Sequence, residues 1–435
     1  MKKYILIILC CLTSFPLWSY NVNMIVEHYS VDQGLPNNTV NCTLKDRDGF
    51  IWFGTWYGLC CFDGVKFKTF NKQEHDSDVP PRKIQRIVED KNGYIWVKTI
   101  DRKLYVFNKV TECFHAVYDD MKNYSENIQV IKLQNTAEGD VLLLTKDKNL
   151  LLAGVDEKGQ VTIKILFDSR DEINKHDYTL KHHVLCETEE YISWIGTDYK
   201  VSAVHKGAEL ASRPADFITS KINSGDKDSF TSFFEDGRKV WVGDRAGIFY
   251  SIDVRTGLVN RYVLSEIKGA ISNLLVTPAG YVYLSVAGQG TYEYDLAERR
   301  LQKINTEMND AMVTHAFIDQ YDKIWFHENE KALIYYDPLN HTAKRFPFTM
   351  FGKITTLYSE DAGERGLFFL SPAGEAWLFD REHAEMVYIN KLKQLSNDRA
   401  NQQFYHLMLD NDGVLWLSSA DEGVYCMNFP KKQFN

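Results

Sequence analysis

The chain contains 435 residues, of which 44% are hydrophobic and 13% aromatic, so it is long enough to bury a large core. Its formal net charge is −9, and acidic and basic residues are interspersed along it. The basic stripe that phosphate backbones require is missing, which excludes nucleic acid as an expected partner. Uncharged or cationic ligands fit this charge better than polyanions, unless a local basic pocket overrides it.

The first residues have the features of an export signal. Lys2 and Lys3 form a positive start, and residues 4–12 form an apolar run that is too short to span a bilayer. Ser19 is a small residue suited to a cleavage site, so we expect a signal peptide over residues 1–20. No later stretch reaches the ~18 apolar residues of a membrane helix. We therefore expect a periplasmic product whose mature chain has no membrane segment.

The cysteines that remain after signal removal lie mostly within apolar strand patterns, and no CxxC pair occurs among them. They are Cys42, Cys60, Cys61, Cys113, Cys186 and Cys426. An oxidising compartment permits disulfides, but this placement favours buried free thiols that act as small hydrophobic groups. We expect no metal and no cofactor.

One short phrase recurs along the chain: a polar turn ending in glycine, an apolar pair ending in tryptophan, then glycine and a second apolar run. Its clearest copy spans residues 46–63, and fainter copies follow every 40 to 50 residues or so. The tryptophan position is occupied in turn by Trp52, Trp96, Leu142, Trp194, Trp241, Tyr283, Trp325, Phe368 and Trp416. A period of this length with strand-type alternation is typical of propeller blades. The sequence therefore predicts an all-β propeller of four-stranded antiparallel blades.

Each unit also carries the signals of its individual strands. Windows such as residues 39–44 and 313–318 alternate or run apolar, as first strands do. Turns rich in Asp, Asn and Gly follow, because tight hairpins need positive φ. We interpret the large second-strand aromatic as a packing plate between blades, and a sugar-stacking platform is the functional alternative.

The first unit resembles a known repeat. Residues 34–40 (GLPNNTV), residues 48–55 (DGFIWFGT) and the pair Gly58-Leu59 are similar to the two-component-regulator propeller repeat. Other units match this repeat moderately or in degenerate form. The resemblance implies the extracytoplasmic sensor region of a bacterial hybrid two-component system, which typically carries two seven-bladed propellers and responds to oligosaccharides.

The same resemblance suggests how the units are divided. Seven units would complete one ring over residues 21–340, and residues 341–435 would supply two blades of a second, incomplete ring. The strand at residues 25–29 would then close the seventh blade. A single ring of eight or nine blades remains open. The chain has no kinase histidine motif and no ATP-binding glycine boxes, so we expect a truncated sensor without its kinase and regulator parts.

The turns between second and third strands form the candidate ligand site. These turns emerge on the same face of a propeller as the connections between blades, and propeller ligands usually lie there. Exposed aromatic rings can stack on sugars, while Asp and Arg can hydrogen-bond hydroxyls. The candidate residues are Trp56, Tyr57, Asp101, Arg102, Asp198, Tyr199, Asp244 and Arg245. Ordinary solvated turns are the alternative interpretation.

Catalytic motifs are missing from the sequence: it contains no HExxH, no GxSxG and no P-loop. Residues 46–49 and 410–413 superficially resemble calcium loops, but neither has the downstream Glu, which favours turn chemistry. We therefore predict a non-enzymatic, ligand-sensing propeller that binds an oligosaccharide and pairs as a homodimer. A secreted polysaccharide lyase or glycosidase is the alternative, and a scaffold that uses an unclosed sheet edge after Tyr425 is a third.

Overall fold

The structure is a computed structural model of the chain. It describes residues 25–70, 80–122, 129–147, 149–168, 180–188, 190–196, 201–207, 215–216, 230–304, 313–328, 331–351, 358–361, 363, 366–371, 375–391 and 404–428. The expected signal peptide, residues 1–20, lies outside these ranges. Within them, no helix has the length and apolar character needed to cross a bilayer.

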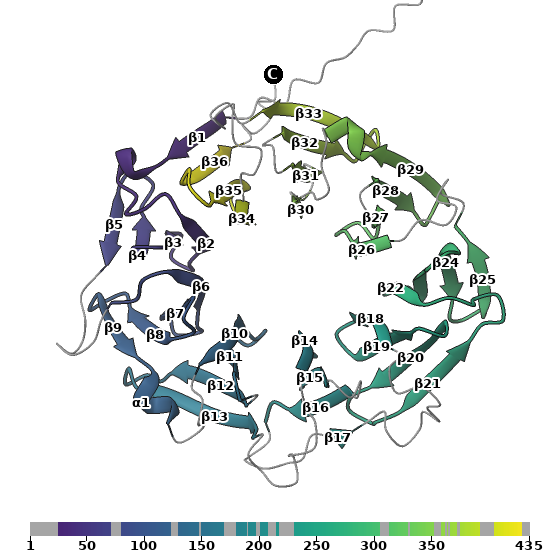
Figure 1. The fold of residues 1–435 in the computed structure, drawn as a ribbon, viewed down its shortest axis with the longest axis horizontal. Coiled ribbons are helices and arrows are strands. Elements are labelled where there is room, and N and C mark those ends of the chain that lie inside the picture. Colours follow the sequence, from purple (N-terminus) through teal and green to yellow (C-terminus); the bar gives the residue numbers. More distant parts are fainter. Residues whose placement is uncertain are drawn as a thin grey trace, which may run out of the picture.

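The strands of the described residues form nine four-stranded antiparallel sheets, arranged as blades around one axis (Figure 1). Blade 1 consists of β2 (Val40–Lys45), β3 (Ile51–Thr55), β4 (Gly58–Phe62) and β5 (Phe67–Phe70). Blade 2 consists of β6 (Ile84–Glu89), β7 (Ile95–Thr99), β8 (Leu104–Asn108) and β9 (Cys113–Ala116). Blade 3 consists of β10 (Val130–Asn135), β11 (Val141–Thr145), β12 (Leu150–Val155) and β13 (Val161–Phe167). Blade 4 consists of β14 (Leu180–Glu187), β15 (Tyr191–Gly196), β16 (Val201–His205) and β17 (Ala215–Asp216). Blade 5 consists of β18 (Phe230–Glu235), β19 (Lys239–Asp244), β20 (Ile248–Asp253) and β21 (Val259–Val263). Blade 6 consists of β22 (Ile271–Val276), β23 (Tyr281–Val286), β24 (Gly290–Asp295) and β25 (Arg300–Lys303). Blade 7 consists of β26 (Val313–Ile318), β27 (Ile324–Glu328), β28 (Ala332–Asp337) and β29 (Thr342–Pro347). Blade 8 consists of β30 (Tyr358–Asp361), β31 (Leu367–Leu370), β32 (Glu375–Asp380) and β33 (Glu385–Lys391). Blade 9 consists of β34 (Phe404–Leu409), β35 (Val414–Ser419), β36 (Val424–Asn428) and the N-terminal strand β1 (Ile25–Tyr29).

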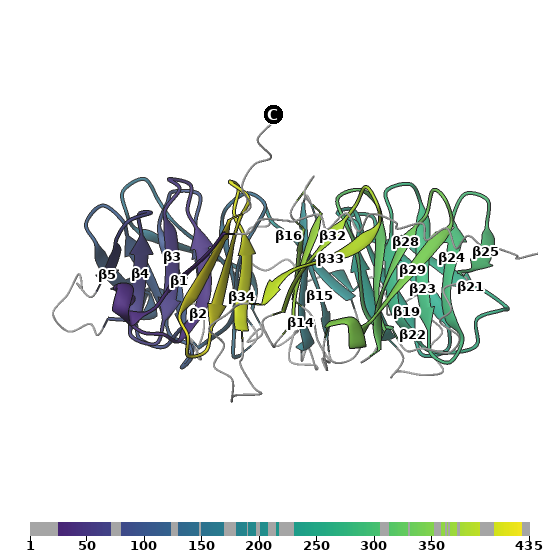
Figure 2. The same cartoon turned by 90° about the horizontal axis from the view of Figure 1, so that it is seen from above.

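The strands that begin blades lie innermost in the ring (Figure 1), and seen edge-on the strands run across the thickness of the disc (Figure 2). Helical elements among the described residues include the short α1 (Tyr118–Met121) and the 3-10 turns η1 (Val31–Gln33) and η3 (Phe348–Phe351). The expected all-β propeller is therefore confirmed.

Nine apolar clusters hold the described blades together, and each cluster bridges two neighbouring blades. Between blades 1 and 2, for example, Trp52 and Phe70 pack with Ile84 and Phe107. The residue at the tryptophan position is at most 5% exposed in every blade. Its predicted role as a packing plate is confirmed, because a flat or bulky apolar group fills the space between facing sheets.

An aspartate before the second strand fixes both the hairpin turn and the tryptophan. Asp46 Oδ1 accepts hydrogen bonds from the backbone N–H groups of Asp48 (3.0 Å) and Phe50 (2.9 Å), and Oδ2 accepts one from Trp52 Nε1 (2.8 Å). The same arrangement recurs at Asp90–Trp96, Asp319–Trp325 and Asp410–Trp416. These aspartates are buried, so the bonds satisfy polar groups that would otherwise destabilise the fold. The calcium-like spacing is thus explained by turn chemistry.

A β-bulge recurs near the start of the innermost strand. Seven of the described blades carry it, with the extra residue at Asn41, Gln85, Ile131, Thr231, Ser272, Thr314 or Tyr405. A bulge leaves backbone groups unpaired and re-aims a side chain. Two of these side chains join neighbouring blades: Asn41 Nδ2 donates to the carbonyl of Ile84 (2.6 Å), and Thr231 Oγ1 donates to the carbonyl of Ile271 (2.7 Å).

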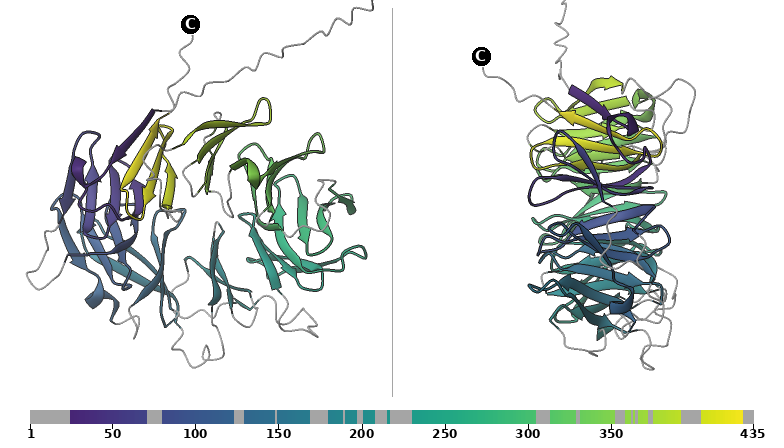
Figure 3. Two further views of the ribbon diagram at one scale, coloured as in Figure 1. Left: turned by 45° about the horizontal axis from the view of Figure 1, so that its top comes forward. Right: turned by 90° about the vertical axis from the view of Figure 1, so that its left-hand side faces the viewer.

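The ring closes through the N-terminal strand. β1 pairs with β36 along its full length, from Ile25 opposite Asn428 to Tyr29 opposite Val424. Figure 3 shows β1 beside the last strands of the chain. The next interface, between blades 9 and 1, packs Phe53 against Trp416 at a ring-centroid distance of 5.9 Å.

This closure differs from the division expected at residue 340. Blade 7 already has four strands of its own, so it has no place for β1. The apolar face of blade 7 that points to the next blade packs against blade 8. Blade 8 packs in the same way against blade 9, and blade 9 packs against blade 1. Residues 341–435 therefore continue the first ring, as in the nine-bladed alternative. The edge of β36 after Tyr425 is covered by β1, so the edge proposed for a scaffold is occupied.

The expectation that the cysteines are free thiols can be checked against the structure for five of the six residues. Cys42, Cys60 and Cys426 are buried, Cys61 and Cys113 are partly exposed, and all five are free thiols. The side chain of Cys186 lies outside the described part of the structure.

Candidate functional site

The turns between second and third strands lie on the same face as the segments that enter the next blade. In blades 1 and 2 the backbone links them directly: Lys83 N–H donates to the carbonyl of Trp56 (2.9 Å), and Ile100 N–H donates to the carbonyl of Lys83 (2.9 Å). The carbonyl of Arg102 in turn accepts from Val130 N–H (2.9 Å), at the entry to blade 3. A continuous hydrogen-bonded rim therefore runs across the first three blades.

Trp56 and Tyr57 form the exposed aromatic part of this rim. Their side chains are 40% and 64% exposed, in a protein whose other tryptophans at repeat positions are buried. Thr55 fixes the turn, because its Oγ1 donates to the carbonyl of Gly58 (2.8 Å) and accepts from Tyr57 N–H (3.1 Å). Lys83 Nζ lies 5.2 Å from the centroid of the Trp56 ring, within range of a cation–π contact.

A pocket of about 400 Å³ lies on blade 2. Its walls include the β7–β8 turn (Asp101 to Lys103), Tyr105, the helix α1 with Tyr118, and Gln129 before β10. Pockets of this size and mixed polarity are suited to small ligands. Sequence reasoning missed Lys83, Tyr118 and Gln129, because they lie in connections between blades that carry no repeat signal.

Asp101 is held within its own turn. Burial alone would raise the pKa of Asp101, but the hydrogen bond from Thr99 Oγ1 and the ammonium of Lys103, 3.4 Å away, outweigh it and lower the pKa. The carboxylate is therefore ionised and oriented at neutral pH. Arg102 adopts φ 69°, in the left-handed region, and its backbone N–H donates to the carbonyl of Thr99 (2.9 Å).

Asp244 and Arg245 occupy the corresponding turn of blade 5, well away from blades 1 and 2 in the ring (Figure 1). Asp244 is 4% exposed, and its Oδ1 accepts from the backbone N–H groups of Ala246 (2.9 Å) and Ile248 (2.8 Å). Burial raises the pKa of Asp244, against the effect of these bonds. A buried Thr or Ser caps the turn at this position in other blades (Thr55, Thr99, Thr145, Ser371, Ser419).

Of the predicted site residues, the structure brings Trp56, Tyr57, Asp101 and Arg102 to neighbouring turns. Asp244 lies inside its turn as a cap, while Arg245 is exposed. Asp198 and Tyr199 lie outside the described residues.

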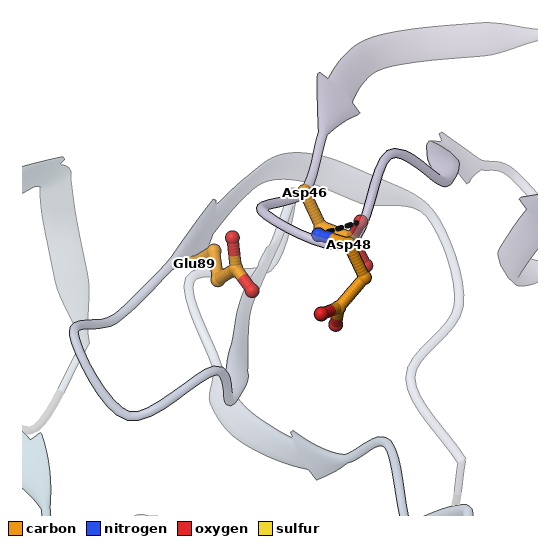
Figure 4. Close-up of side chains that lie close together, drawn as sticks. All are labelled: Asp46, Asp48 and Glu89. Carbon is orange, nitrogen blue, oxygen red and sulfur yellow. Dashed lines mark hydrogen bonds between the residues drawn. The ribbon is translucent and has the colours of Figure 1, made fainter.

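A cluster of three carboxylates lies on the opposite face, between blades 1 and 2. Asp46, Asp48 and Glu89 point toward one another (Figure 4) and their oxygens lie within 4.8 Å. Lys109 reaches into this cluster from the turn after β8, with Nζ at 3.0, 2.6 and 2.8 Å from the three carboxylates respectively. Burial alone would lower the pKa of Lys109, but these hydrogen bonds outweigh it and raise the pKa. The ammonium thus supplies the positive charge that a metal ion would supply.

The same cation position recurs in other blades. Lys206 lies 2.5 Å from Glu187 in blade 4 and 3.5 Å from Glu138 of blade 3. Arg381 lies 2.6 Å from Asp361 in blade 8 and 2.5 Å from Asp319 of blade 7. Each basic residue follows the third strand of its own blade and reaches a turn of the preceding one. The recurrence indicates a structural clamp between blades.

Replacing Lys109 with methionine is expected to lower the free energy of unfolding by about 2 kcal/mol, because the buried carboxylate of Asp46 and the partly buried one of Glu89 lose their counter-charge. Thermal and urea melts measure this. In the wild type, Lys109 holds the pKa of Asp48 below 3.8 by hydrogen bonding and charge. This stabilisation is present above pH 3.8 and is lost as the pH falls, so the two proteins should converge in acid.

The matched control is Lys68→Met, which breaks an exposed pair with Glu112 (side chains 59% and 42% exposed). It should cost less than ~1 kcal/mol. Equal losses for the two variants would contradict a specific role for Lys109.

Comparisons with known proteins place one segment in a family. Residues 34–57, which contain β2, β3 and the Trp56–Tyr57 turn, match the family model described as Two component regulator propeller. A comparison with curated proteins finds no match.

The solved structures that are similar include two extracellular domains of hybrid two-component systems from B. thetaiotaomicron. The BT3049 domain is 16% identical, with 95% of this chain and 54% of that chain covered and a TM-score of 0.35. The BT4673 domain is 14% identical, with 93% and 67% covered and a TM-score of 0.33. Virginiamycin B lyase from Staphylococcus aureus is 7% identical, with 93% and 99% covered and a TM-score of 0.36. The chain thus spans about half the length of the first of these domains.

Proposed function

We propose that this chain, which carries a two-component regulator propeller repeat, is a ligand-sensing region of a bacterial signalling protein that works outside the cytoplasm. The observation that carries this proposal is the exposed pair Trp56–Tyr57, inside the matched repeat. Lys83 links this turn through backbone hydrogen bonds to the β7–β8 turn of blade 2, which lines a pocket of about 400 Å³. Two consecutive exposed aromatic residues in one rim turn give a ligand an apolar surface on which to stack.

An oligosaccharide is the ligand class that suits this rim. The apolar face of a sugar stacks on an aromatic ring, and hydroxyl groups accept or donate hydrogen bonds at charged side chains. Trp56 and Tyr57 supply rings, while Asp101 and Arg102 supply an acceptor and a donor on the adjacent turn. Sensing further requires that the ligand favour one arrangement of paired sensor regions, so we include a homodimer in the proposal.

A hydrolytic or lyase role would need carboxylates that are free to exchange protons with a substrate. The acids considered for that role in the described turns are engaged. Asp244 caps its turn, and Glu328 is 4% exposed and lies 3.0 Å from Arg345. Asp101 is held by Thr99. Their arrangement favours binding over catalysis.

The test is a titration of an oligosaccharide panel by calorimetry, followed by the double variant Trp56→Ala/Tyr57→Ala. We expect a glycan that binds the wild type to bind the variant at least tenfold more weakly, a loss of about 1.4 kcal/mol or more. The same assay with product analysis detects any cleavage of the glycan.

Phe50→Ala is the matched control. Phe50 is 42% exposed and belongs to the same blade, but it lies in the β2–β3 turn on the opposite face. Unchanged affinity in the double variant, or an equal loss in Phe50→Ala, would exclude the rim of blade 1 as the binding surface.

A further inference from the structure

Two basic residues face each other across the inner strands of blade 2. Arg86 on β6 lies directly opposite Lys98 on β7 in the antiparallel register. Side chains of directly opposed residues lie on the same side of a sheet, and like charges in such a pair destabilise it. The pair lies next to the last residue of β7, so it is close to the rim that carries the β7–β8 turn.

The repeat supplies an internal comparison for this position. The pair that follows the bulge is Cys42–Gly54, Lys132–Leu144, Ser232–Gly243, Asn273–Ser285, His315–His327 and His406–Ser418 in the other blades with this bulge. None of these pairs combines two side chains with permanent positive charge. A Cβ atom added at Gly54 or Gly243 would lie 2.4 Å from a neighbouring side-chain atom. In these two blades the position is therefore packed too tightly for any residue larger than glycine. The blade 2 pair therefore departs from the packing solution used elsewhere in the described ring.

Lys98 is also unusually buried for a lysine, at 5% exposure. Its Nζ donates a hydrogen bond to the neutral Oε1 of Gln85, the bulged residue of the same blade. Burial, and to a smaller extent the charges of Arg102 and Arg86, lower the pKa of Lys98 to about 8. Both arginines therefore act on the Lys98 ammonium as unfavourable neighbours.

No carboxylate among the described residues compensates these charges. Neither Arg86 nor Arg102 forms an ion pair within the described ranges, and Gln85 is the hydrogen-bond partner of Lys98 there. Asp101, the acid of the neighbouring turn, is engaged by Thr99 and Lys103. In a chain of net charge −9, three cations are thus left without an anion at one place on the rim.

We propose that Arg86, Lys98 and Arg102 form an anion-binding site at the inner rim of blade 2, and that the ligand carries a carboxylate or sulfate group. The inference deepens the proposed function by naming the charge of the ligand. Arg86 is exposed on the innermost strand, and Arg102 lines the pocket of about 400 Å³. A guanidinium group can bind such an anion with two parallel hydrogen bonds, while an ammonium group acts as a point charge.

Burial makes the site selective as well as attractive. An anion that reaches Lys98 converts an unfavourable buried charge into a paired one, and a neutral analogue leaves that charge unpaired. The overall negative charge of the chain repels anions, and this local basic pocket overrides it at short range.

The experiment compares D-glucuronate with D-glucose, which differ in one carboxylate, and adds glucose 6-sulfate and inorganic sulfate at constant ionic strength. Lysines are labelled by 13C reductive methylation, and the Lys98 signals are assigned with Lys98→Met. We expect glucuronate or the sulfated sugar to raise the apparent pKa of Lys98 by at least one unit and to raise the melting temperature, while glucose does neither. Inorganic sulfate acting as strongly as both sugars would indicate a free anion as the ligand and would overturn the link to a sugar.

Two variants keep the inference testable. Lys98→Met should melt at a higher temperature than the wild type in anion-free buffer, because the like-charge pair is removed, and should lose at least tenfold in affinity for the anion. Lys268→Met removes one charge from the same face, in the loop between β21 and β22, and should change neither property. A lower melting temperature for Lys98→Met with unchanged anion response would overturn the proposal, because Lys98 would then act only through Gln85.

The outcomes separate this inference from the proposed function. If a neutral oligosaccharide binds and requires Trp56 while Lys98 is irrelevant, the anion site is wrong and the sensing rim stands. If the acidic sugar binds and requires Lys98 but not Trp56, the anion site stands and the aromatic rim is wrong.

Discussion

Replacing Trp325 with alanine is expected to lower the free energy of unfolding by about 3–5 kcal/mol, the cost typical of removing a large aromatic side chain from a core. Trp325 is fully buried on β27, and its ring lies 4.6 Å from that of Phe379 and 5.3 Å from that of Phe369. Both phenylalanines belong to blade 8. The substitution therefore removes the main plate between blades 7 and 8, together with the hydrogen bond from Nε1 to Asp319 (3.2 Å).

The number of unfolding transitions tests whether the blades form one ring or two. In one closed ring the loss should shift a single cooperative transition, measured by calorimetry and by circular dichroism in urea. If residues after about 340 belonged to a separate second ring, the wild type would melt in two steps and Trp325→Ala would move only one of them. Trp56→Ala is the matched control, because this exposed tryptophan has little packing to lose and should change stability by less than ~0.5 kcal/mol.

Local structure was predictable from the sequence because the repeat encodes it locally. The pair Asp46 and Trp52 defines a hairpin and its packing tryptophan within seven residues, and the same signal recurs in four further described blades with small variations. Degenerate units such as that of Leu142 were also found, since burial requires only a bulky apolar group at that position.

The number of blades in the ring was not predictable in the same way. Closure depends on the angle between neighbouring sheets, which many weak contacts at each interface determine together. The repeat motif of one blade does not specify the combined effect of these contacts on the angle. The strand at residues 25–29 was expected to close the seventh blade, whereas its register with β36 places it in the ninth.

The candidate site was predictable only where it coincides with the repeat. Trp56 and Arg102 lie in the turn that follows the second strand of their units, so topology placed them on one face. Lys98 occupies a position that is glycine or serine in several other units, and its opposite residue Arg86 lies in a different strand. Recognising that pair requires the register between two strands and the position of the bulge, neither of which the spacing of the motif supplies.

A cysteine at position 27 should form a disulfide with the native Cys426. The two residues lie directly opposite each other in the pairing of β1 with β36, although they are far apart in the sequence. Burial, and to a smaller extent the charges of Glu27 and Asp410, raise the pKa of Cys426 to about 12, so oxidation will need alkaline conditions. Removing the Glu27 carboxylate also favours the thiolate that attacks.

The cross-link should stabilise the ring by about 2–4 kcal/mol, because it closes nearly the whole chain into a loop in the unfolded state. A shift in mobility on a non-reducing gel and peptide mapping detect the bond, and a melt before and after reduction measures its effect. His28→Cys lies opposite Tyr425, which has no thiol, and Glu27→Cys combined with Cys426→Ser lacks the acceptor. Neither should cross-link. If β1 instead closed a seventh blade, positions 27 and 426 would be too far apart to react, and Glu27→Cys would stay reduced while the chain remained folded.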